Sequence, residues 1–269
     1  MERRFDPATQ ALLVNGRPIY LGLYDIQGYN PLHLARYDDV MTALNGASQD
    51  YHTANLLASG LHSPLLDLLD VRYILVDASL PARRFDVATI AADNREVFRT
   101  DRFVVYERDP VPHAWIVHDL RAVARGEALP LLTSGTVDPY RTALVEGPLP
   151  AAADPPPGAA EAARVTAYTP DRLTIATESA APGLLVVSEI YESGWRAYVD
   201  GVPAPVLPTD HALRGVPLPA GEHVVELRYE PLSLRLGLLI SGVAALLIAA
   251  ICAAAIRRRY FARYPARTS

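Results

Sequence analysis

One uninterrupted apolar stretch constrains this chain most: residues 236–256, LGLLISGVAALLIAAICAAAI, contain no charged side chain. At about 1.5 Å rise per residue, a helix of this length spans roughly 30 Å, the thickness of a bilayer's hydrocarbon core. Soluble core helices are rarely so long and so uniformly apolar, so a buried helix of a soluble protein is the weaker interpretation. We therefore expect a transmembrane helix over residues 234–256.

The charges that flank this helix predict its orientation. Five arginines follow it: Arg257, Arg258, Arg259, Arg263 and Arg267. Only Arg235 lies at the other end, and no acidic residue follows Glu230. Because an excess of arginine marks the cytoplasmic side, residues 257–269 are predicted to form a cytoplasmic basic tail, with the preceding domains outside the cell membrane.

The opening residues, MERRFDPATQ, contain neither a basic and then apolar signal peptide nor an earlier span. A large polar part nevertheless needs something to carry it across the membrane. Either the chain is tail-anchored in the opposite sense, against its arginines, or it is the last portion of a longer polytopic protein. We favour the second interpretation, in which Met1 is an internal methionine, a misassigned start or a truncation.

Composition excludes several classes of protein. The only cysteine, Cys252, lies inside the apolar stretch, so neither a disulfide framework nor a cysteine zinc site is expected. The net charge is −5, and because the five terminal arginines have no acidic neighbours, the part before the helix carries about −10. An acidic surface argues against nucleic acid as a partner.

Two domains are predicted before the helix. Residues 1–146 read as an α/β or α+β domain, with helices ending at Asn45-Gly46, through 54–58 and over 65–70, a buried strand over 71–76, and a hairpin around Asp101-Arg102. Residues 147–162, which include Pro155-Pro156-Pro157, read as a linker. Residues 163–231 contain short alternating runs between turn signals, which is typical of a β-sandwich.

No catalytic residue, metal site or cofactor emerges from the motifs. Asp38 and Asp39 are adjacent on a helix, so their side chains diverge, and we interpret them, with Asp25, as solvated surface. The histidines His33, His52 and His62 lack the spacing of a helical metal pair. His113, His118 and Asp119 lie around a strand end, but no G-x-S-x-G, P-loop or dinucleotide fingerprint accompanies them.

The β domain offers candidate glycan-binding residues, since sugar sites combine aromatic platforms with polar groups. The candidates are Tyr191, Tyr198, Asp200 and Arg214. Trp195 alternates with Ala197 and Val199 onto one face and is expected in the core, while Arg214 lies near Asp210 and His211 and could simply pair with Asp210. Many alanines in the apolar stretch make a small-residue surface, which favours packing against other membrane helices.

The segments VSEIYESGWRAYVDG, HALRGVPLPAGEHVVELRYEP and SLRLGLLIS resemble the end of the YfhO family of bacterial membrane proteins. DIQGYNPLHLARYDDVM and LLDLLDVRYIL look like that family's extracytoplasmic region. The resemblance implies a polytopic glycosyltransferase of the C type that moves sugar from a polyprenyl-phosphate donor to a cell-envelope glycopolymer. Its catalytic carboxylate would lie near helices that this chain does not contain, so no catalytic residue is carried over.

Three hypotheses follow. The first is a non-catalytic C-terminal portion of a YfhO-like protein, in contact with the bilayer and the remaining helices and helping to shape the acceptor side. The second is a single-pass surface protein whose sandwich binds glycan or another protein. The third is purely structural. An open reading frame upstream of Met1 that encodes apolar helices would favour the first, and genuine start signals the second.

Overall fold

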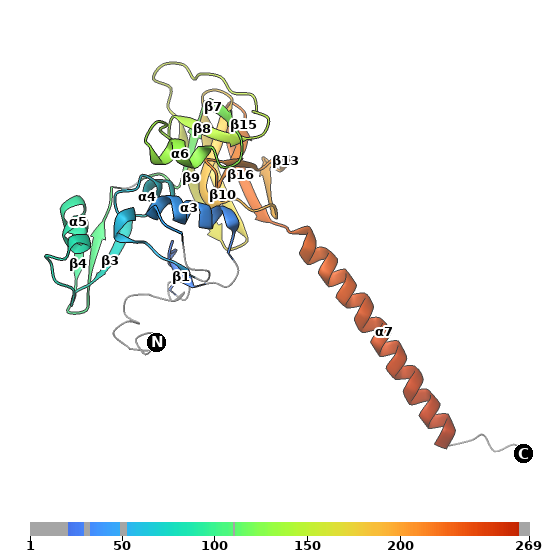
Figure 1. The fold of residues 1–269 in the computed structure, drawn as a ribbon. Helices are drawn as coiled ribbons and strands as arrows, with labels where there is room; N and C mark the ends of the chain where they lie inside the picture. The colour runs from blue at the N-terminus through green and yellow to red at the C-terminus, as the bar shows by residue number, and fades with distance from the viewer. Residues whose placement is uncertain (1–20, 30–32, 49–52, 110, 264–269) are drawn as a thin grey trace, which may run out of the picture. The chain divides into compact units, whose positions relative to one another are not determined.

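The computed structural model describes the chain except for residues 1–20, 30–32, 49–52, 110 and 264–269 (Figure 1). His52 and the start of the first predicted helix therefore lie outside the described residues. The described chain forms two compact units. The first contains the residues up to Glu192 together with Arg196–Arg228, and the second contains Ser193–Trp195 and the chain from Tyr229 onward.

A six-stranded sheet is the largest element of the first unit. Its strands, in spatial order, are β6 (Ala114–Val117), β11 (Gly183–Ile190), β15 (Leu213–Leu218), β14 (Leu207–Thr209), β8 (Thr142–Glu146) and β7 (Asp119–Val123). Only β7 and β8 pair in parallel, and the other pairs are antiparallel. Strands from both sides of residues 147–162 thus share one sheet. The proline-rich segment joins two parts of one compact unit, where the sequence predicted a boundary between domains.

A five-stranded sheet contains most of the remaining C-terminal strands. Its spatial order is β13 (Val202–Ala204), β12 (Trp195–Val199), β16 (Gly221–Tyr229), β10 (Arg172–Ser179) and β9 (Ala162–Thr169). Leu173 and Ile175 of β10, and Val225 and Leu227 of β16, are buried, while their neighbours along each strand are more exposed. This alternation buries one face of the sheet, and β9 contacts β6 of the larger sheet.

Helices cover one face of the six-stranded sheet. They are α3 (Ala35–Asn45), α4 (Leu65–Leu68) and α6 (Ala128–Thr133). Their apolar side chains share a core cluster with Leu184 and Val186 of β11. Leu185 and Val187 point to the opposite face of that strand and are also fully buried, so the sheet is covered on both faces.

A small three-stranded sheet has its own core. Its order is β3 (Tyr73–Asp77), β5 (Phe103–Glu107) and β4 (Arg95–Arg99), all antiparallel, and α5 (Phe85–Asp93) contributes Val87 and Ile90 to the same cluster. The predicted hairpin around Asp101-Arg102 is therefore present. A two-stranded pair, β1 (Gly28–Tyr29) and β2 (Thr53–Ala54), completes the sheets of the described chain.

The helix predicted through residues 54–58 is wrong. Side chains take the backbone groups that such a helix would need: Asn45 donates to Asn55 O and accepts from Leu57 N, and Gln27 accepts from Leu56 N, each at 2.8 Å. The chain is extended here and then forms a 3-10 turn, Ala58–Gly60. Gly46 ends α3 with a φ of 65°, as the Asn45-Gly46 pair predicted.

The second unit consists mainly of α7 (Leu232–Arg263). Within Leu232–Ala255 an 18-residue window has a mean hydropathy of 2.6, and none of that window is buried within the structure, so the helix is long and apolar enough to cross a membrane. Arg235 pairs with Glu230 at 2.8 Å. Trp195, expected in the core, is only partly buried and stacks on Tyr229, with ring centroids 5.4 Å apart.

The coarser part of the fold class is thus confirmed: the described chain is a mixed α/β structure with several sheets and one long apolar C-terminal helix. All the elements between residues 162 and 229 are strands, as their alternating pattern predicted.

Candidate functional site

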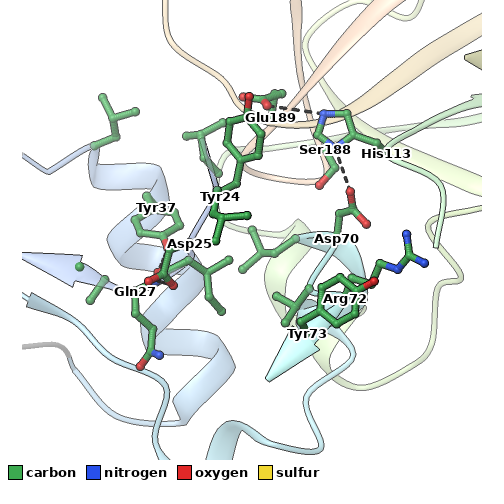
Figure 2. Close-up of a pocket in the computed structure, with 18 of the residues that line it drawn as sticks. Tyr24, Asp25, Gln27, Tyr37, Asp70, Arg72, Tyr73, His113, Ser188 and Glu189 are labelled. Carbon is green, nitrogen blue, oxygen red and sulfur yellow. Dashed lines mark hydrogen bonds and ion pairs between the residues drawn. The ribbon is translucent and has the colours of Figure 1, made fainter. Parts of the chain in front are cut away.

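A cavity of about 760 Å³ lies in the first unit and is a candidate for a binding site. Its walls come from residues 22–28, the start of α3, the connection from α4 to β3, and the ends of β9 and β11 (Figure 2). A concave site of this volume, with both aromatic and polar walls, is typical of small-molecule binding.

His113 joins three of these walls. Its Nδ1 lies 3.0 Å from Asp70 Oδ2, and its Nε2 lies 3.5 Å from Glu189 Oε1 (Figure 2). Asp70 follows α4 with a φ of 51°, an uncommon conformation for a residue other than glycine. Burial lowers the pKa of His113, but the hydrogen bonds and charges of Asp70 and Glu189 outweigh burial and raise it to about 9. At neutral pH this imidazole is therefore a cation between two carboxylates.

Glu189 is held in place from its other side. The Tyr168 hydroxyl donates a hydrogen bond to it, and Arg214 NH2 lies 3.5 Å from its Oε2. Burial raises the pKa of Glu189, but the contacts with His113, Tyr168 and Arg214 outweigh burial and lower it. Arg214, which is 4% exposed, also donates to Ile190 O at 3.0 Å. Burial lowers the pKa of Arg214 to about 10, so it remains charged at neutral pH.

Tyrosine rings form the apolar part of the cavity. Tyr24 is 77% exposed and packs on Tyr168, with ring centroids 4.7 Å apart. Tyr37 donates its hydroxyl proton to Ile26 O, and Tyr73 lies under the guanidinium of Arg72 at 5.2 Å. In the view of Figure 2, the Tyr24 side chain lies between Asp25 and Glu189. The cavity thus presents an accessible aromatic face with carboxylates on either side.

Asp25 lies on the side of the cavity away from His113 (Figure 2). Its Oδ1 accepts a hydrogen bond from Gln27 N at 2.8 Å. Desolvation by the surrounding protein raises the pKa of Asp25, and the hydrogen bond from Gln27 opposes that rise. Asp25 is exposed, as the sequence predicted, and it also lines the cavity.

The four residues predicted to bind glycan do not meet at one place. Arg214 supports the cavity through Glu189. Tyr191 lies under Arg36 at 5.4 Å, and Tyr198 lies under Arg228 at 4.7 Å. Asp200 is in the turn of the β12–β13 hairpin, where it accepts from Val224 N at 2.8 Å and pairs with His223 at 2.6 Å. Glycan binding by these four residues stays a prediction.

A second polar cluster connects α3 with β8 and with the turn between β14 and β15. Arg36 makes two hydrogen bonds of 2.7 Å to Glu146 and a third to His211 O. His211 lies 3.0 Å from Asp39. Asp38 pairs instead with His33 at 2.8 Å, so the two neighbouring aspartates do diverge, but both are paired rather than merely solvated.

Asp210 is the innermost acid of this second cluster. Its Oδ1 accepts from Leu144 N at 2.9 Å, while its Oδ2 is buried without a hydrogen-bond partner in the described structure. Burial raises the pKa of Asp210 to about 7, against the hydrogen bond from Leu144. Arg214 therefore does not neutralise Asp210, as the sequence had suggested it could, and pairs with Glu189 instead.

The cavity residues that sequence reasoning missed come from distant parts of the chain. Asp70 and His113 are 43 positions apart, and no local spacing links them to Glu189 or Tyr24. The sequence groups His113 with His118 and Asp119, because the three lie around one strand end. In the structure His118 pairs with Glu161 at 2.8 Å, and Asp119 accepts a hydrogen bond from Thr142. No group of three or more His, Cys, Asp or Glu among the described residues could hold a metal ion.

Comparison with known proteins identifies one family. Residues 158–241 match the family described as bacterial membrane protein YfhO. This match covers β9 to β16 and the first part of α7, so the resemblance is confirmed there and stays a prediction for the rest of the chain. Neither a curated protein nor a solved structure matches the chain.

Proposed function

We propose that this chain is the C-terminal, extracytoplasmic portion of a YfhO-type membrane protein that transfers sugar from a polyprenyl-phosphate donor to a cell-envelope glycopolymer. In this proposal the chain binds the glycan acceptor in the cavity and does not itself catalyse the transfer. The match of residues 158–241 to a bacterial membrane protein family supports the membrane context. The glycosyltransferase role rests on the resemblance alone.

The single observation that carries the binding role is the composition of the cavity. An exposed ring, Tyr24, lies beside carboxylates whose neighbours hold them in position. Sugar rings present apolar faces that pack on aromatic side chains, and their hydroxyls donate to carboxylate oxygens. Tyr24 would contact a sugar face, Asp25 and Asp70 would accept from hydroxyls, and Tyr168 and Arg214 would keep Glu189 in place.

Binding can be measured by titration calorimetry on the full chain in detergent micelles, with the N-acetylglucosamine trimer as the probe. We expect Tyr24→Ala to weaken binding at least tenfold, since a stacking ring is lost. Phe85→Ala is the matched control: Phe85 is 71% exposed on α5 and does not line the cavity, so its loss should leave binding unchanged. Equal affinities for the wild type and Tyr24→Ala would contradict a glycan site here.

The proposed topology places the first unit outside the cell, because the arginines after α7 mark the cytoplasmic side. In a Cys252→Ala background, Thr136→Cys in an exposed loop should react with a membrane-impermeant maleimide in intact spheroplasts. Thr268→Cys should react only after permeabilisation. The opposite pattern would reverse the orientation.

The alternative is a single-pass surface protein that uses the β12–β13 hairpin to bind glycan or protein. Tyr198 and Asp200 are already engaged by Arg228, His223 and Val224 N, so the cavity offers more accessible groups. An upstream open reading frame that encodes membrane helices favours the polytopic protein, and start signals directly before Met1 favour the alternative.

A further inference from the structure

The acids of the cavity differ in the cations they face. Glu189 faces His113 and Arg214, and Asp70 faces His113. Arg72, the arginine that lines the cavity, donates to Glu107 at 3.0 Å. Asp25 makes no ion pair with any residue that the structure describes, and its hydrogen bond comes from the neutral Gln27 N.

The surroundings of Asp25 favour a cation in its vicinity. Tyr37 lies close enough for the charge of Asp25 to raise the pKa of its hydroxyl. Asp25 and Tyr24 both line the cavity, and the Tyr24 ring extends toward Glu189 (Figure 2). Tyrosine faces attract cations, and the attraction grows where water is partly excluded. Asp25 is exposed where it lines the cavity, so a cation can reach its carboxylate, and pairing would also offset the partial desolvation that raises its pKa.

The net negative charge of the residues before α7 also favours a cationic ligand. These residues carry about −10, and such a field raises the local concentration of cationic ligands and accelerates their association. An anionic ligand, by contrast, would meet repulsion both from this field and from Asp25, which has no cationic partner in the described part of the chain. The affinity of a neutral glycan would be raised neither by the net charge nor by the Asp25 carboxylate.

We propose that the cavity binds a sugar that carries a free, protonated amino group, which pairs with Asp25 while the sugar ring packs on Tyr24. This inference rests on the proposed function and specifies the class of glycan. The remaining hydroxyls meet Asp70, which His113 holds in place. The amino group thus supplies the cation that Asp25 lacks among the described residues.

Two probes of equal length test this proposal: the glucosamine trimer, with free amines, and the N-acetylglucosamine trimer, in which acetylation removes the charge. Calorimetry at pH 6 keeps the amines protonated, since amino groups of this kind lose their proton near pH 8. We expect the wild-type chain to bind the glucosamine trimer at least tenfold more tightly than the acetylated trimer. Asp25→Asn should bring the two affinities within about threefold of each other.

Asp101→Asn is the control for bulk charge, because Asp101 is an exposed acid in the β4–β5 turn and lies away from the cavity. It should preserve the preference for the glucosamine trimer. Thermal unfolding controls for the fold: the Asp25→Asn chain should unfold at the same midpoint temperature as the wild type.

The outcomes separate the two proposals. Equal binding of both trimers by the wild type overturns the amine contact and leaves glycan binding standing. A preference that survives in Asp25→Asn, or that Asp101→Asn reduces equally, also overturns it, because the charge effect is then not local. Binding of neither trimer overturns the amine contact and, with it, the assignment of the cavity as a glycan site.

Discussion

His211 and His113 each lie between two carboxylates, and their geometries are similar. His211 Nε2 is 3.0 Å from Asp39 and its Nδ1 is 4.0 Å from Glu146; His113 has neighbours at 3.0 and 3.5 Å. Their exposure differs, since the His211 side chain is 2% exposed and the His113 side chain 27%. The first is enclosed by protein, whereas the second borders the cavity.

The enclosed cluster contributes to the fold. Arg36 connects α3 both to β8, through Glu146, and to the turn before β15, through His211 O, so removing one partner leaves another buried and uncompensated. The cavity cluster consists of Asp70, His113, Tyr168 and Glu189. Its hydrogen bonds and ion pairs hold Asp70 and Glu189 in position, while the cavity leaves part of each carboxylate accessible. The same residue types therefore serve the fold in one place and a candidate site in the other, and access to solvent is what separates them.

The largest expected effect belongs to the enclosed cluster. Arg36→Ala leaves Glu146, whose side chain is 12% exposed, without its two hydrogen bonds. Breaking a buried pair in this way costs about 3 kcal/mol of the free energy of unfolding. Denaturant titration of the full chain in detergent measures it. Arg141→Ala is the control, because Arg141 is 87% exposed and its pair with Asp138 should contribute less than about 0.5 kcal/mol.

The cavity cluster should make the free energy of unfolding depend on pH. The pKa of His113 is raised from 6.5 to about 9, so its contribution to stability is fully present below pH 6.5 and is lost as the pH rises through 9. Because the side chain is partly exposed, we expect a loss on the order of 2 kcal/mol across that window.

His113→Gln should remove the His113 part of the stability lost between pH 6 and pH 9.5 and leave the part that comes from Asp210. Denaturant titrations at the two pH values measure the difference from the wild type. His62→Gln, which removes an exposed pair with Asp93, is the control and should keep the slope of the wild type. A His113→Gln chain that still loses as much stability as the wild type would place the titrating group elsewhere.

Asp210 gives the enclosed cluster a pH dependence in a different window. Its pKa is raised from 3.8 to about 7, so stability is greatest below about pH 4 and is lost as the pH rises through 7. Asn is neutral and tolerates the positive φ of 50° at this position. We expect Asp210→Asn to stabilise the chain by about 1 kcal/mol or more at pH 8. The stability that the chain loses between pH 8 and pH 9.5, where the His113 contribution varies, should stay the same as in the wild type. Destabilisation at pH 8 would mean that the carboxylate form is needed.

The strands of the C-terminal region could be predicted from local pattern. β12 and β15 have the predicted bounds, because alternating apolar residues and a turn at Asp200-Gly201, both with positive φ, specify them locally. Neither the joining of β6 to β11 nor the cavity could be predicted in this way. Both depend on pairing between residues far apart in the chain, such as Asp70 with His113, for which one sequence contains no local signal.

The smallest effect tests whether the cavity cluster supports the ligand or contacts it. Tyr168→Phe keeps the ring on which Tyr24 packs and removes only the hydroxyl that donates to Glu189. We expect a loss of about 1 kcal/mol in the free energy of unfolding and a two- to threefold weaker binding of the glucosamine trimer, because Glu189 is less well held. Tyr73→Phe, at an exposed tyrosine of the same cavity, is the matched control and should change neither quantity measurably. If Tyr168→Phe weakened binding as strongly as Tyr24→Ala, Glu189 would contact the sugar directly rather than support the cavity from behind, and its role would differ from that of the buried acids of the enclosed cluster.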